Sequence, residues 1–398
     1  MVENIIPKNW KIKKLGDVLK VSSGKGLKIN LLQGGDFPVY GGNGINGYHT
    51  EYLNESPKLI IGRVGAKCGV TCITKPKSWV TDNALIVDPI IPDFDIKFFQ
   101  LKLEYENLNK LSVSTAQPVI SGSKIYEYEI LLPPLSEQQA IVYKIEELLS
   151  DLENGKQQLQ IAQQQLKIYR QSLLKWAFEG RLTNKDVKDG ELPKGWKSTK
   201  LGFVCHKIQD GSHFSPQVQY DEPGENRYMY ITAKNIRNDY MDFRKLSYVD
   251  KDFHDSIYSR CNPEFGDVLL TKDGVNTGEA TLNTLHEPFS LLSSVCIFKP
   301  KKYDLESRFL KYYIQSPLGS KLISDSMTGT AIKRIILRKI KDALIIIPPF
   351  LEQQLIVDEL ESKLTVCDKI EETISQSLLQ AESLRQSILK KAFEGKLI

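Results

Sequence analysis

Apolar side chains recur at alternating intervals of four and three residues in two stretches of the chain, residues 141–176 and 356–391. This spacing is that of a heptad seam and predicts two long amphipathic helices. The second seam has the same phase but is weaker, because Lys363 and Lys391 fall on it. In the first stretch the seam consists of Ile141, Ile145, Leu148, Leu152, Gly155, Leu159, Ala162, Leu166, Tyr169, Leu173 and Trp176.

The two stretches belong to an internal repeat with a constant offset of 215 residues. Residues 133–149, PPLSEQQAIVYKIEELL, match residues 348–364, PPFLEQQLIVDELESKL. The same offset aligns the two A-F-E-G strings that end at Gly180 and Gly395. Glycine suits the left-handed position just after a helix. A repeat of this length indicates a duplicated supersecondary unit.

A helix from Leu135 to Glu179 would be roughly 68 Å long at about 1.5 Å per residue. This is too long for one compact domain, and a single amphipathic helix cannot bury its own apolar stripe. We therefore expect the two helices to pack on each other in antiparallel fashion.

The segments before the helices also correspond, though more loosely. Pro7-Lys8-Asn9-Trp10 resembles Pro193-Lys194-Gly195-Trp196, and residues 58–65 parallel residues 267–274. Between these anchors the sequences diverge and the loops differ in length. We predict a mixed α/β (α+β) fold with pseudo-twofold symmetry. It consists of two globular modules, residues 1–132 and 183–347, and two long antiparallel coiled-coil helices, residues 133–182 and 348–398.

The first module contains a literal G-x-G-x-x-G, formed by Gly42, Gly44 and Gly47. In a dinucleotide-binding turn the third glycine opens a helix whose N-terminus holds the pyrophosphate. The following residues lack a helical period and lead into the β-like run 58–61. The string therefore predicts a glycine-rich turn between strands.

Composition narrows the classes of function. Net charge is +4, and the positive excess lies in residues 1–132 and 182–347, a distribution compatible with nucleic acid meeting the modules. The six cysteines form no C-x-x-C pair and the five histidines no H-x-x-x-H pair, so we expect reduced thiols and no metal site. There is no apolar run of about 18 residues and no signal-peptide pattern, so we expect a cytoplasmic protein.

Motifs for catalysis are missing from the sequence. A DNA amino-methyltransferase uses an Asn/Asp-Pro-Pro-aromatic motif, whereas the nearest string here is Asn262-Pro263-Glu264-Phe265. The chain has no G-x-x-x-x-G-K-[ST] loop for ATP and no convincing metal-nuclease set. We therefore expect a chain that is not itself an enzyme.

The order of module, E-Q-Q helix, A-F-E-G end, second module opening L-P-x-G-W, and second helix resembles the specificity subunit of type I restriction-modification enzymes. The resemblance covers essentially the whole chain. It implies two target recognition domains, each reading one half of a bipartite asymmetric DNA site, and helices that dock two methyltransferase subunits. It also implies restriction subunits in the full complex. S-adenosylmethionine, ATP and Mg would be used by the partner subunits, and none would be bound by this chain.

One turn and two pairs of loops are candidates for DNA contact: the 40–49 turn, the loops at 62–67 and 271–278, and the segments 112–117 and 327–334. Glycine lets backbone approach a phosphate, asparagine can pair with adenine and arginine with guanine. The candidate DNA-binding residues are Asn43, Asn46, Tyr48, Arg63, Lys67, Gln117, Lys272, Asn276, Thr277, Lys333 and Arg334.

The repeated E-Q-Q and A-F-E-G strings are candidates for docking a partner or the chain's own modules, with simple helix capping as the alternative. The candidate partner-binding residues are Glu137, Gln138, Gln139, Glu352, Gln353, Gln354, Phe178 and Phe393. Alternative functions are a stand-alone or silent specificity protein for methylation only, a nuclease or methyltransferase with an unrecognised motif, and a coiled-coil spacer with protein-binding modules.

Overall fold

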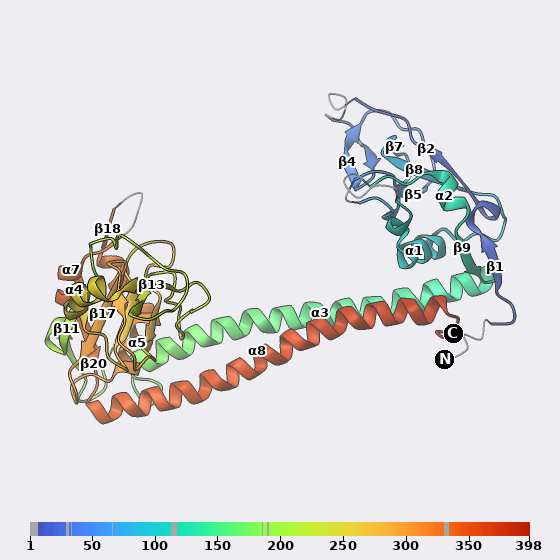
Figure 1. The fold of residues 1–398 in the computed structure, drawn as a ribbon. Helices are drawn as coiled ribbons and strands as arrows, with labels where there is room; N and C mark the ends of the chain where they lie inside the picture. The colour runs from blue at the N-terminus through green and yellow to red at the C-terminus, as the bar shows by residue number, and fades with distance from the viewer. Residues whose placement is uncertain are drawn as a thin grey trace. The chain divides into compact units, whose positions relative to one another are not determined.

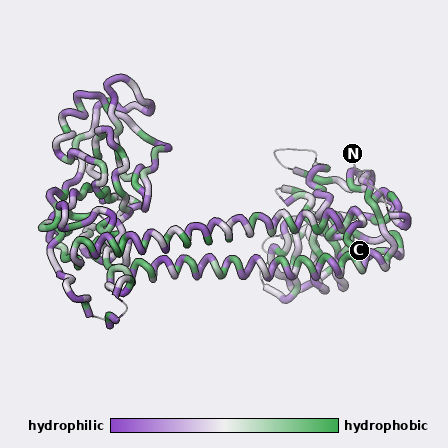
Figure 2. Tube along the Cα trace, turned by 90° about the horizontal axis from the view of Figure 1, so that it is seen from below, coloured by the Kyte–Doolittle hydropathy of each residue, from purple (hydrophilic) through white to green (hydrophobic). Residues whose placement is uncertain are grey.

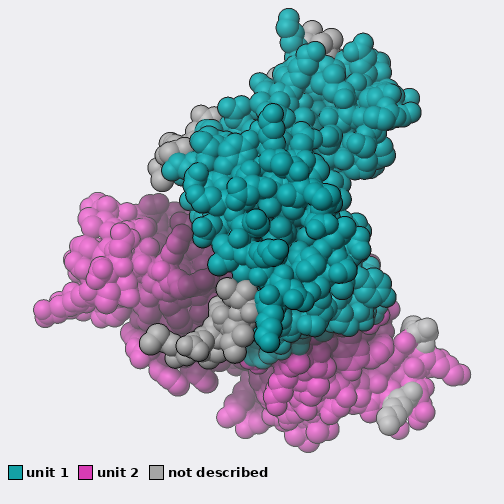
Figure 3. All heavy atoms as spheres, turned by 90° about the vertical axis from the view of Figure 1, so that its right-hand side faces the viewer, with its two compact units in different colours: residues 1–160, 375–398 teal, residues 161–374 magenta. Residues whose placement is uncertain are grey.

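The computed structural model describes residues 7–28, 32, 34–65, 67–112, 118–184, 186–188, 191–329 and 334–398. The chain divides into two compact units, one formed by Met1–Gln160 with Ser375–Ile398 and the other by Ile161–Ile374 (Figure 3). Each unit holds one globular module and parts of two long helices (Figure 1). The boundary between the units falls within each of the two long helices.

The first module is built on two small sheets. The four-stranded antiparallel sheet has the order β2-β8-β5-β6, and the three-stranded sheet has the order β4-β3-β7. The first strand, β1, pairs with the last, β9, directly before the first long helix. The elements are β1 (Lys11–Lys14), η1 (Leu15–Asp17), β2 (Leu19–Ser23), β3 (Phe37–Gly41), β4 (Gly44–His49), β5 (Leu59–Gly62), β6 (Thr71–Ile73), β7 (Trp79–Val80), β8 (Ala84–Pro89), α1 (Ile96–Glu106), η3 (Leu108–Leu111), α2 (Gly122–Tyr126) and β9 (Glu129–Leu132).

The glycine-rich turn joins β3 to β4, which run antiparallel with a register shift at Val39/Tyr40. The chain continues from Gly44, at φ +95°, into a strand. The prediction of a turn between strands is thus confirmed, and no helix follows that could hold a pyrophosphate in the manner of a dinucleotide fold.

The second module repeats this plan. Its sheets have the orders β11-β17-β14-β15 and β13-β12-β16, and β10 pairs with β20 before the second long helix. It adds α4, α6 and the β18–β19 hairpin. The elements are β10 (Lys197–Lys200), η4 (Leu201–Phe203), β11 (Cys205–Asp210), β12 (Arg227–Ile231), β13 (Ser247–Asp250), α4 (Lys251–Cys261), β14 (Val268–Thr271), β15 (Ala280–Leu282), β16 (Ser290–Leu291), β17 (Val295–Pro300), α5 (Ser307–Gln315), α6 (Pro317–Asp325), β18 (Met327–Thr328), β19 (Arg334–Ile335), α7 (Leu337–Asp342) and β20 (Leu344–Ile347).

The two long helices are α3 (Leu135–Phe178) and α8 (Phe350–Phe393), each 44 residues long. Lys156 of α3 pairs with Glu382 of α8 at 4.0 Å in the first unit, and Arg170 pairs with Asp368 at 2.6 Å in the second. The partner on α8 moves backward as the position on α3 advances, so the helices are antiparallel, as predicted. None of the helices in the described part of the chain has the length and apolarity needed to cross a membrane.

The heptad seam is only partly the buried face. Ile141 and Ile145 are fully buried, but Tyr169 and Trp176 are 42% and 39% exposed. The prediction is wrong at these two positions because the last turns of α3 bury a neighbouring stripe, with Phe178 at 1% exposure, in the core of the second module. Hydrophobic positions recur along both helices in Figure 2.

Candidate nucleic-acid interface

Two candidate loops of the first module lie together, whereas the third candidate segment, 112–117, lies outside the described residues apart from Ser112. A Cβ on Gly42 would meet the Asn83 carbonyl oxygen at 2.8 Å and the Gly62 Cα at 3.6 Å, so the β3–β4 turn lies against the start of the β5–β6 loop, residues 63–70. That loop is bridged to the segment after residue 117 because Gly65 N–H donates to the Pro118 carbonyl at 3.0 Å. The β3–β4 turn, the β5–β6 loop and the segment that begins at Pro118 therefore lie side by side.

The side chains predicted to contact DNA in the first module are mostly exposed. Asn43, Asn46 and Lys67 are exposed, and Tyr48 is 45% exposed. Arg63 is half-buried, and its Nη1 donates to Ser23 Oγ at 3.3 Å. Gln117 lies outside the described residues, so its predicted role stays a prediction.

The second module has the same convergence. Its β14–β15 loop, residues 272–279, contacts β19 because Ile335 N–H donates to the Lys272 carbonyl at 3.2 Å. Asp273 and Arg334 form an isolated bridge between the two segments, and their side chains are 3.8 Å apart. Lys333 lies outside the described residues, whereas Arg334 is well exposed.

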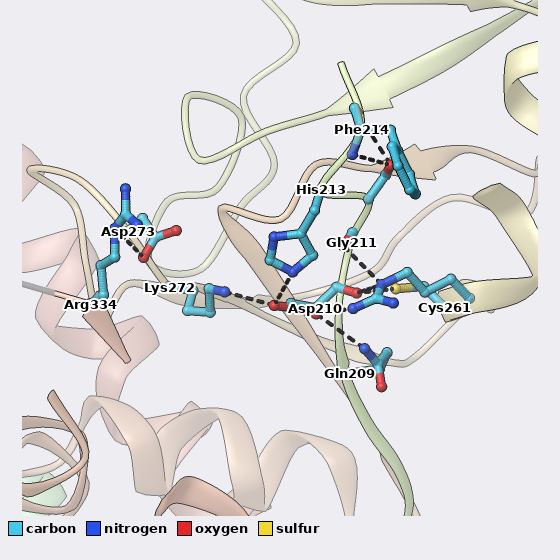
Figure 4. A network of polar contacts seen from close by, with 11 residues as sticks. Gln209, Asp210, Gly211, His213, Phe214, Cys261, Lys272, Asp273 and Arg334 are labelled. Carbon is cyan, nitrogen blue, oxygen red and sulfur yellow. Dashed lines mark hydrogen bonds and ion pairs between the residues drawn. The ribbon is translucent and has the colours of Figure 1, made fainter. Parts of the chain in front are cut away.

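Lys272 occupies a different place from the one expected of a DNA contact (Figure 4). It is 8% exposed, and its Nζ donates to Asp210 Oδ2 at 2.7 Å. The other carboxylate oxygen, Oδ1, accepts from Arg260 Nη2 at 2.7 Å, and His213 Nε2 lies 3.0 Å from Oδ2. The ammonium of Lys272 is therefore engaged inside the module, where it anchors the 272–279 loop to the end of β11.

The first module has a weaker version of this anchor. Arg63 follows β5 as Lys272 follows β14, and Ser23 ends β2 as Asp210 ends β11. In both modules the cation that follows the third strand of the four-stranded sheet thus reaches the last residue of the edge strand, which lies two strands away. A hydroxyl partner leaves the arginine freer than a buried carboxylate leaves the lysine.

Asp210 stays charged because of its partners. Burial alone would raise the pKa of its carboxyl, but hydrogen bonds from Lys272 and Arg260, with their charges, outweigh burial and lower the pKa below its usual range. The residue is 3% exposed, so the paired charge lies inside the module.

The tip of the 272–279 loop is exposed and is held by hydrogen bonds within the loop. Thr277 Oγ donates to the Gly274 carbonyl at 2.6 Å, and Gly278 N–H donates to the Thr271 carbonyl at 2.9 Å. Asn276 is half-buried, whereas Val275 at the tip is fully exposed. Val275 is not among the candidate residues predicted from the sequence. Its one signal in the sequence is its place beside Gly274.

The first glutamine of each E-Q-Q block faces the chain itself. Gln138 is 0% exposed; its Oε1 accepts from Asp95 N–H at 3.0 Å, and its Nε2 donates to the carbonyls of Asp93 and Pro133 at 3.1 and 3.0 Å. Gln353 is equally buried and makes the same three backbone contacts in the second module, with Glu306, Asp304 and Pro348.

The glutamates and phenylalanines of the repeat are also engaged internally. Glu137 accepts from Trp10 Nε1 at 2.8 Å, and Glu352 accepts from Trp196 Nε1 at 3.0 Å. Phe178 and Phe393 are 1% and 2% exposed. The expectation of partner contact is corrected for the buried Gln138, Gln353, Phe178 and Phe393, because the chain's own modules cover these side chains.

The remaining members of the block stay accessible. Gln139 is exposed and Gln354 is half-buried. Both stand beside exposed apolar side chains near the helix starts: Tyr143 is 73% exposed in the first unit, and Leu351 and Leu355 are 74% and 62% exposed in the second. These residues form a polar and apolar surface at the start of each long helix that the chain itself leaves uncovered.

The family model for the type I restriction modification DNA specificity domain matches residues 7–163 and 193–380. The type I restriction enzyme EcoBI specificity subunit of Escherichia coli is 28% identical over 302 residues, covering 73% of this chain and 62% of that protein. The MjaIX specificity subunit of Methanocaldococcus jannaschii is 23% identical over 376 residues, covering 86% of this chain and 84% of that protein.

Solved structures share the fold. A chain from the structure described as "Structural basis underlying complex assembly and conformational transition of the type I R-M system" matches with a TM-score of 0.74 at 18% identity, covering 98% of this chain and 99% of that chain. The HsdS subunit from Thermoanaerobacter tengcongensis matches with a TM-score of 0.65 at 18% identity, covering 98% of both chains.

Proposed function

Because this chain belongs to the type I restriction modification DNA specificity family, we propose that it is the DNA-recognition subunit of a type I restriction-modification complex. Each module reads one half of a bipartite asymmetric site. The observation that carries the proposal is the duplication of one scaffold whose candidate loops converge within each module but differ in sequence and length. Equal scaffolds with unequal loops suit two unlike half-sites on one duplex.

The partners follow from the same duplication. We propose that two methyltransferase subunits dock on the two helix starts, where Gln139 and Gln354 stand beside exposed apolar side chains. Two copies of one surface suit two copies of one partner. Restriction subunits would join in the full complex, and S-adenosylmethionine, ATP and Mg would be used by the partner subunits. Within the described residues, no group of three or more His, Cys, Asp or Glu side chains is placed to hold a metal ion.

Methylation-sensitive sequencing of the source genome, with and without this gene, tests the proposal. We expect one split, asymmetric methylated motif to disappear on deletion. A duplex carrying that motif should bind the purified protein with an affinity that falls steeply with salt, because phosphate contacts release counterions. An unchanged methylome together with salt-independent or absent DNA binding would contradict the proposal and favour a spacer with protein-binding modules.

A further inference from the structure

The two modules differ most in the connection that follows the first strand of the three-stranded sheet. In the first module β3 and β4 are joined by residues 42–43 alone, whereas in the second β12 and β13 are joined by residues 232–246 and followed directly by α4. If the two modules read different half-sites, the residues that read bases belong where the modules differ. The 232–246 segment is therefore the place to look in the second module.

A cavity of about 720 Å³ opens beside this segment. Its walls are formed by parts of residues 219–221, 232–234, 243–248 and 292–294, together with Tyr230 of β12. This volume lies within the roughly 300–1,000 Å³ of pockets that hold small ligands. Most of the wall comes from connections that the first module does not share.

Tyr230 is the unusual residue of the cavity. It is 1% exposed, yet its hydroxyl has no hydrogen-bond partner among the residues that the structure describes. Its ring packs with Val249 and Ile257 and lies edge-on to Phe253, with centroids 6.0 Å apart. An unpaired buried hydroxyl is destabilising, and phenylalanine would fill the same space without that cost. A ligand in the cavity that hydrogen-bonds this hydroxyl would remove that cost.

The rim of the cavity carries an excess of positive charge. Lys234, Arg244 and Lys245 are exposed there, against Asp221. Arg244 is held in place by a bidentate pair with Asp242, with Nε at 2.9 Å and Nη2 at 2.7 Å. Cations of this kind suit a phosphate, and an aromatic side chain beside them suits a base.

The cavity is continuous with the candidate DNA-binding loop. Ser294, in its wall, accepts a hydrogen bond at Oγ from Ala233 N–H at 3.1 Å. The carbonyl of the same serine accepts from Lys272 N–H at 2.7 Å, at the start of the 272–279 loop. A duplex lying on that loop would therefore pass beside the cavity.

We infer that this cavity receives one nucleotide of the target DNA, with the Tyr230 hydroxyl hydrogen-bonding its base and Lys234 and Lys245 contacting its phosphate. The inference rests on the proposed function and gives the second module a base-reading pocket whose walls come partly from the 232–246 connection, which in the first module is reduced to residues 42–43. Burial raises the pKa of Tyr230 to about 12, so the hydroxyl is protonated and able to donate at neutral pH. Taking a base out of the stack costs energy, and contacts in the pocket must offset that cost.

Tyr230→Phe tests the inference because it removes only the hydroxyl. In the full-length protein, with the subunits that accompany it, we expect the Kd for the cognate duplex to rise on the order of three- to tenfold. The free protein should be as stable as wild type or more stable, since an unpaired buried hydroxyl is lost. Tyr228→Phe is the matched control: it lies on the same strand and face, stacks on His254 and does not line the cavity. This control should leave the Kd unchanged.

A second measurement locates the nucleotide. The duplex is labelled with 2-aminopurine at each position of the half-site in turn, and a rise in fluorescence on binding marks an unstacked base. We expect one such position with wild type and a smaller rise at that position with the double variant Lys234→Ala, Lys245→Ala. An unchanged Kd of Tyr230→Phe, whatever its stability, would overturn the inference and leave a purely structural hydroxyl. Failure of the wild type to bind any methylated motif would overturn the proposed function itself.

Discussion

Asp210 is the residue that fixes the base of the candidate DNA-binding loop in the second module. Its carboxylate holds Lys272 from that loop and Arg260 from α4 at the same time, both at 2.7 Å. Removing one partner of a buried ion pair is costly because the other charge stays buried without compensation. The loop position thus depends on one carboxylate at the end of β11.

Asp210→Asn should therefore lower the free energy of unfolding of the second unit by about 3 kcal/mol. It leaves the buried side chain of Lys272 without an opposite charge on Asp210. Urea unfolding followed by circular dichroism measures the change. Asp255→Asn is the control, because Asp255 pairs with Lys251 on the surface of α4, and its loss should cost less than about 1 kcal/mol. Equal effects of the two variants would contradict the assignment.

The same pair predicts a pH dependence. The pKa of Asp210 is lower in the folded state than its ordinary value of 3.8, so the unfolded chain binds the proton more readily. The stabilisation from Asp210 is therefore present above the ordinary pKa and is lost as pH falls through the folded-state pKa. The difference in unfolding free energy between wild type and Asp210→Asn should be constant above about pH 5 and shrink below about pH 4. A difference that stays constant or grows on acidification to about pH 2 would be incompatible with this account.

At the residue scale the sequence located the loops but did not reveal the surroundings of each side chain. Lys272 was expected to contact DNA because it stands in a glycine-containing loop, but its partner Asp210 is 62 residues away in the chain. The burial that makes this pair internal arises only when β11, β14 and α4 come together. Asn43, Asn46 and Tyr48 remain predictions, since exposure alone does not show what they contact.

At the scale of elements, each module has one joint at which one long helix begins and the other long helix ends. In the first module Glu137, near the start of α3, accepts from Trp10 Nε1, and Gly395, after α8, packs on Pro7. A Cβ at Gly395, where φ is +71°, would lie 2.3 Å from the Pro7 Cγ. The joint explains why the tryptophan, E-Q-Q and A-F-E-G signals recur together in the sequence. The second module has the same joint, with Trp196, Glu352 and Gly180 at the matching places.

Adjacent glutamines in this joint allow a matched test. Gln138→Leu leaves three backbone groups without their hydrogen bonds and should lower the unfolding free energy of the first unit by about 2 kcal/mol. Gln139→Leu removes an exposed side chain of the same type and should change stability by less than about 0.5 kcal/mol. Differential scanning calorimetry of both variants provides the comparison. If Gln139→Leu proved the more destabilising, the internal role given to Gln138 would be wrong.

The elements show where sequence reasoning succeeds and where it stops. Both helices, their antiparallel packing and the turn at residues 42–43 follow from period, repeat and glycine position, which are local or exact signals. The seam failed at Tyr169 and Trp176 because a globular module, and not the other helix, decides which stripe is buried there. The cavity beside residues 232–246 carries no sequence pattern, since its walls come from four separate segments.

At the scale of the whole molecule, sequence neighbours and structural neighbours differ. The core of the first module contains Leu389 and Phe393 from the last helix of the chain. The core of the second module contains Leu173 and Phe178, from the end of α3, the helix that directly precedes this module in the sequence. The second unit is therefore one contiguous segment, Ile161–Ile374, whereas the first unit closes around a helix end that is remote from it in the sequence.

This packing predicts that truncating a buried side chain at a helix end destabilises the module in whose core that end lies. Phe393→Ala should loosen the first unit and Phe178→Ala the second, each by about 3–5 kcal/mol, because both phenylalanines are buried among aromatic side chains. Hydrogen exchange of the buried strands β5 and β14 reports the two units separately in one experiment. Each variant is the control for the other: Phe178→Ala should accelerate exchange in β14 more than in β5, and Phe393→Ala should do the reverse. Faster exchange in β5 than in β14 with Phe178→Ala would contradict the packing of the end of α3 in the second module.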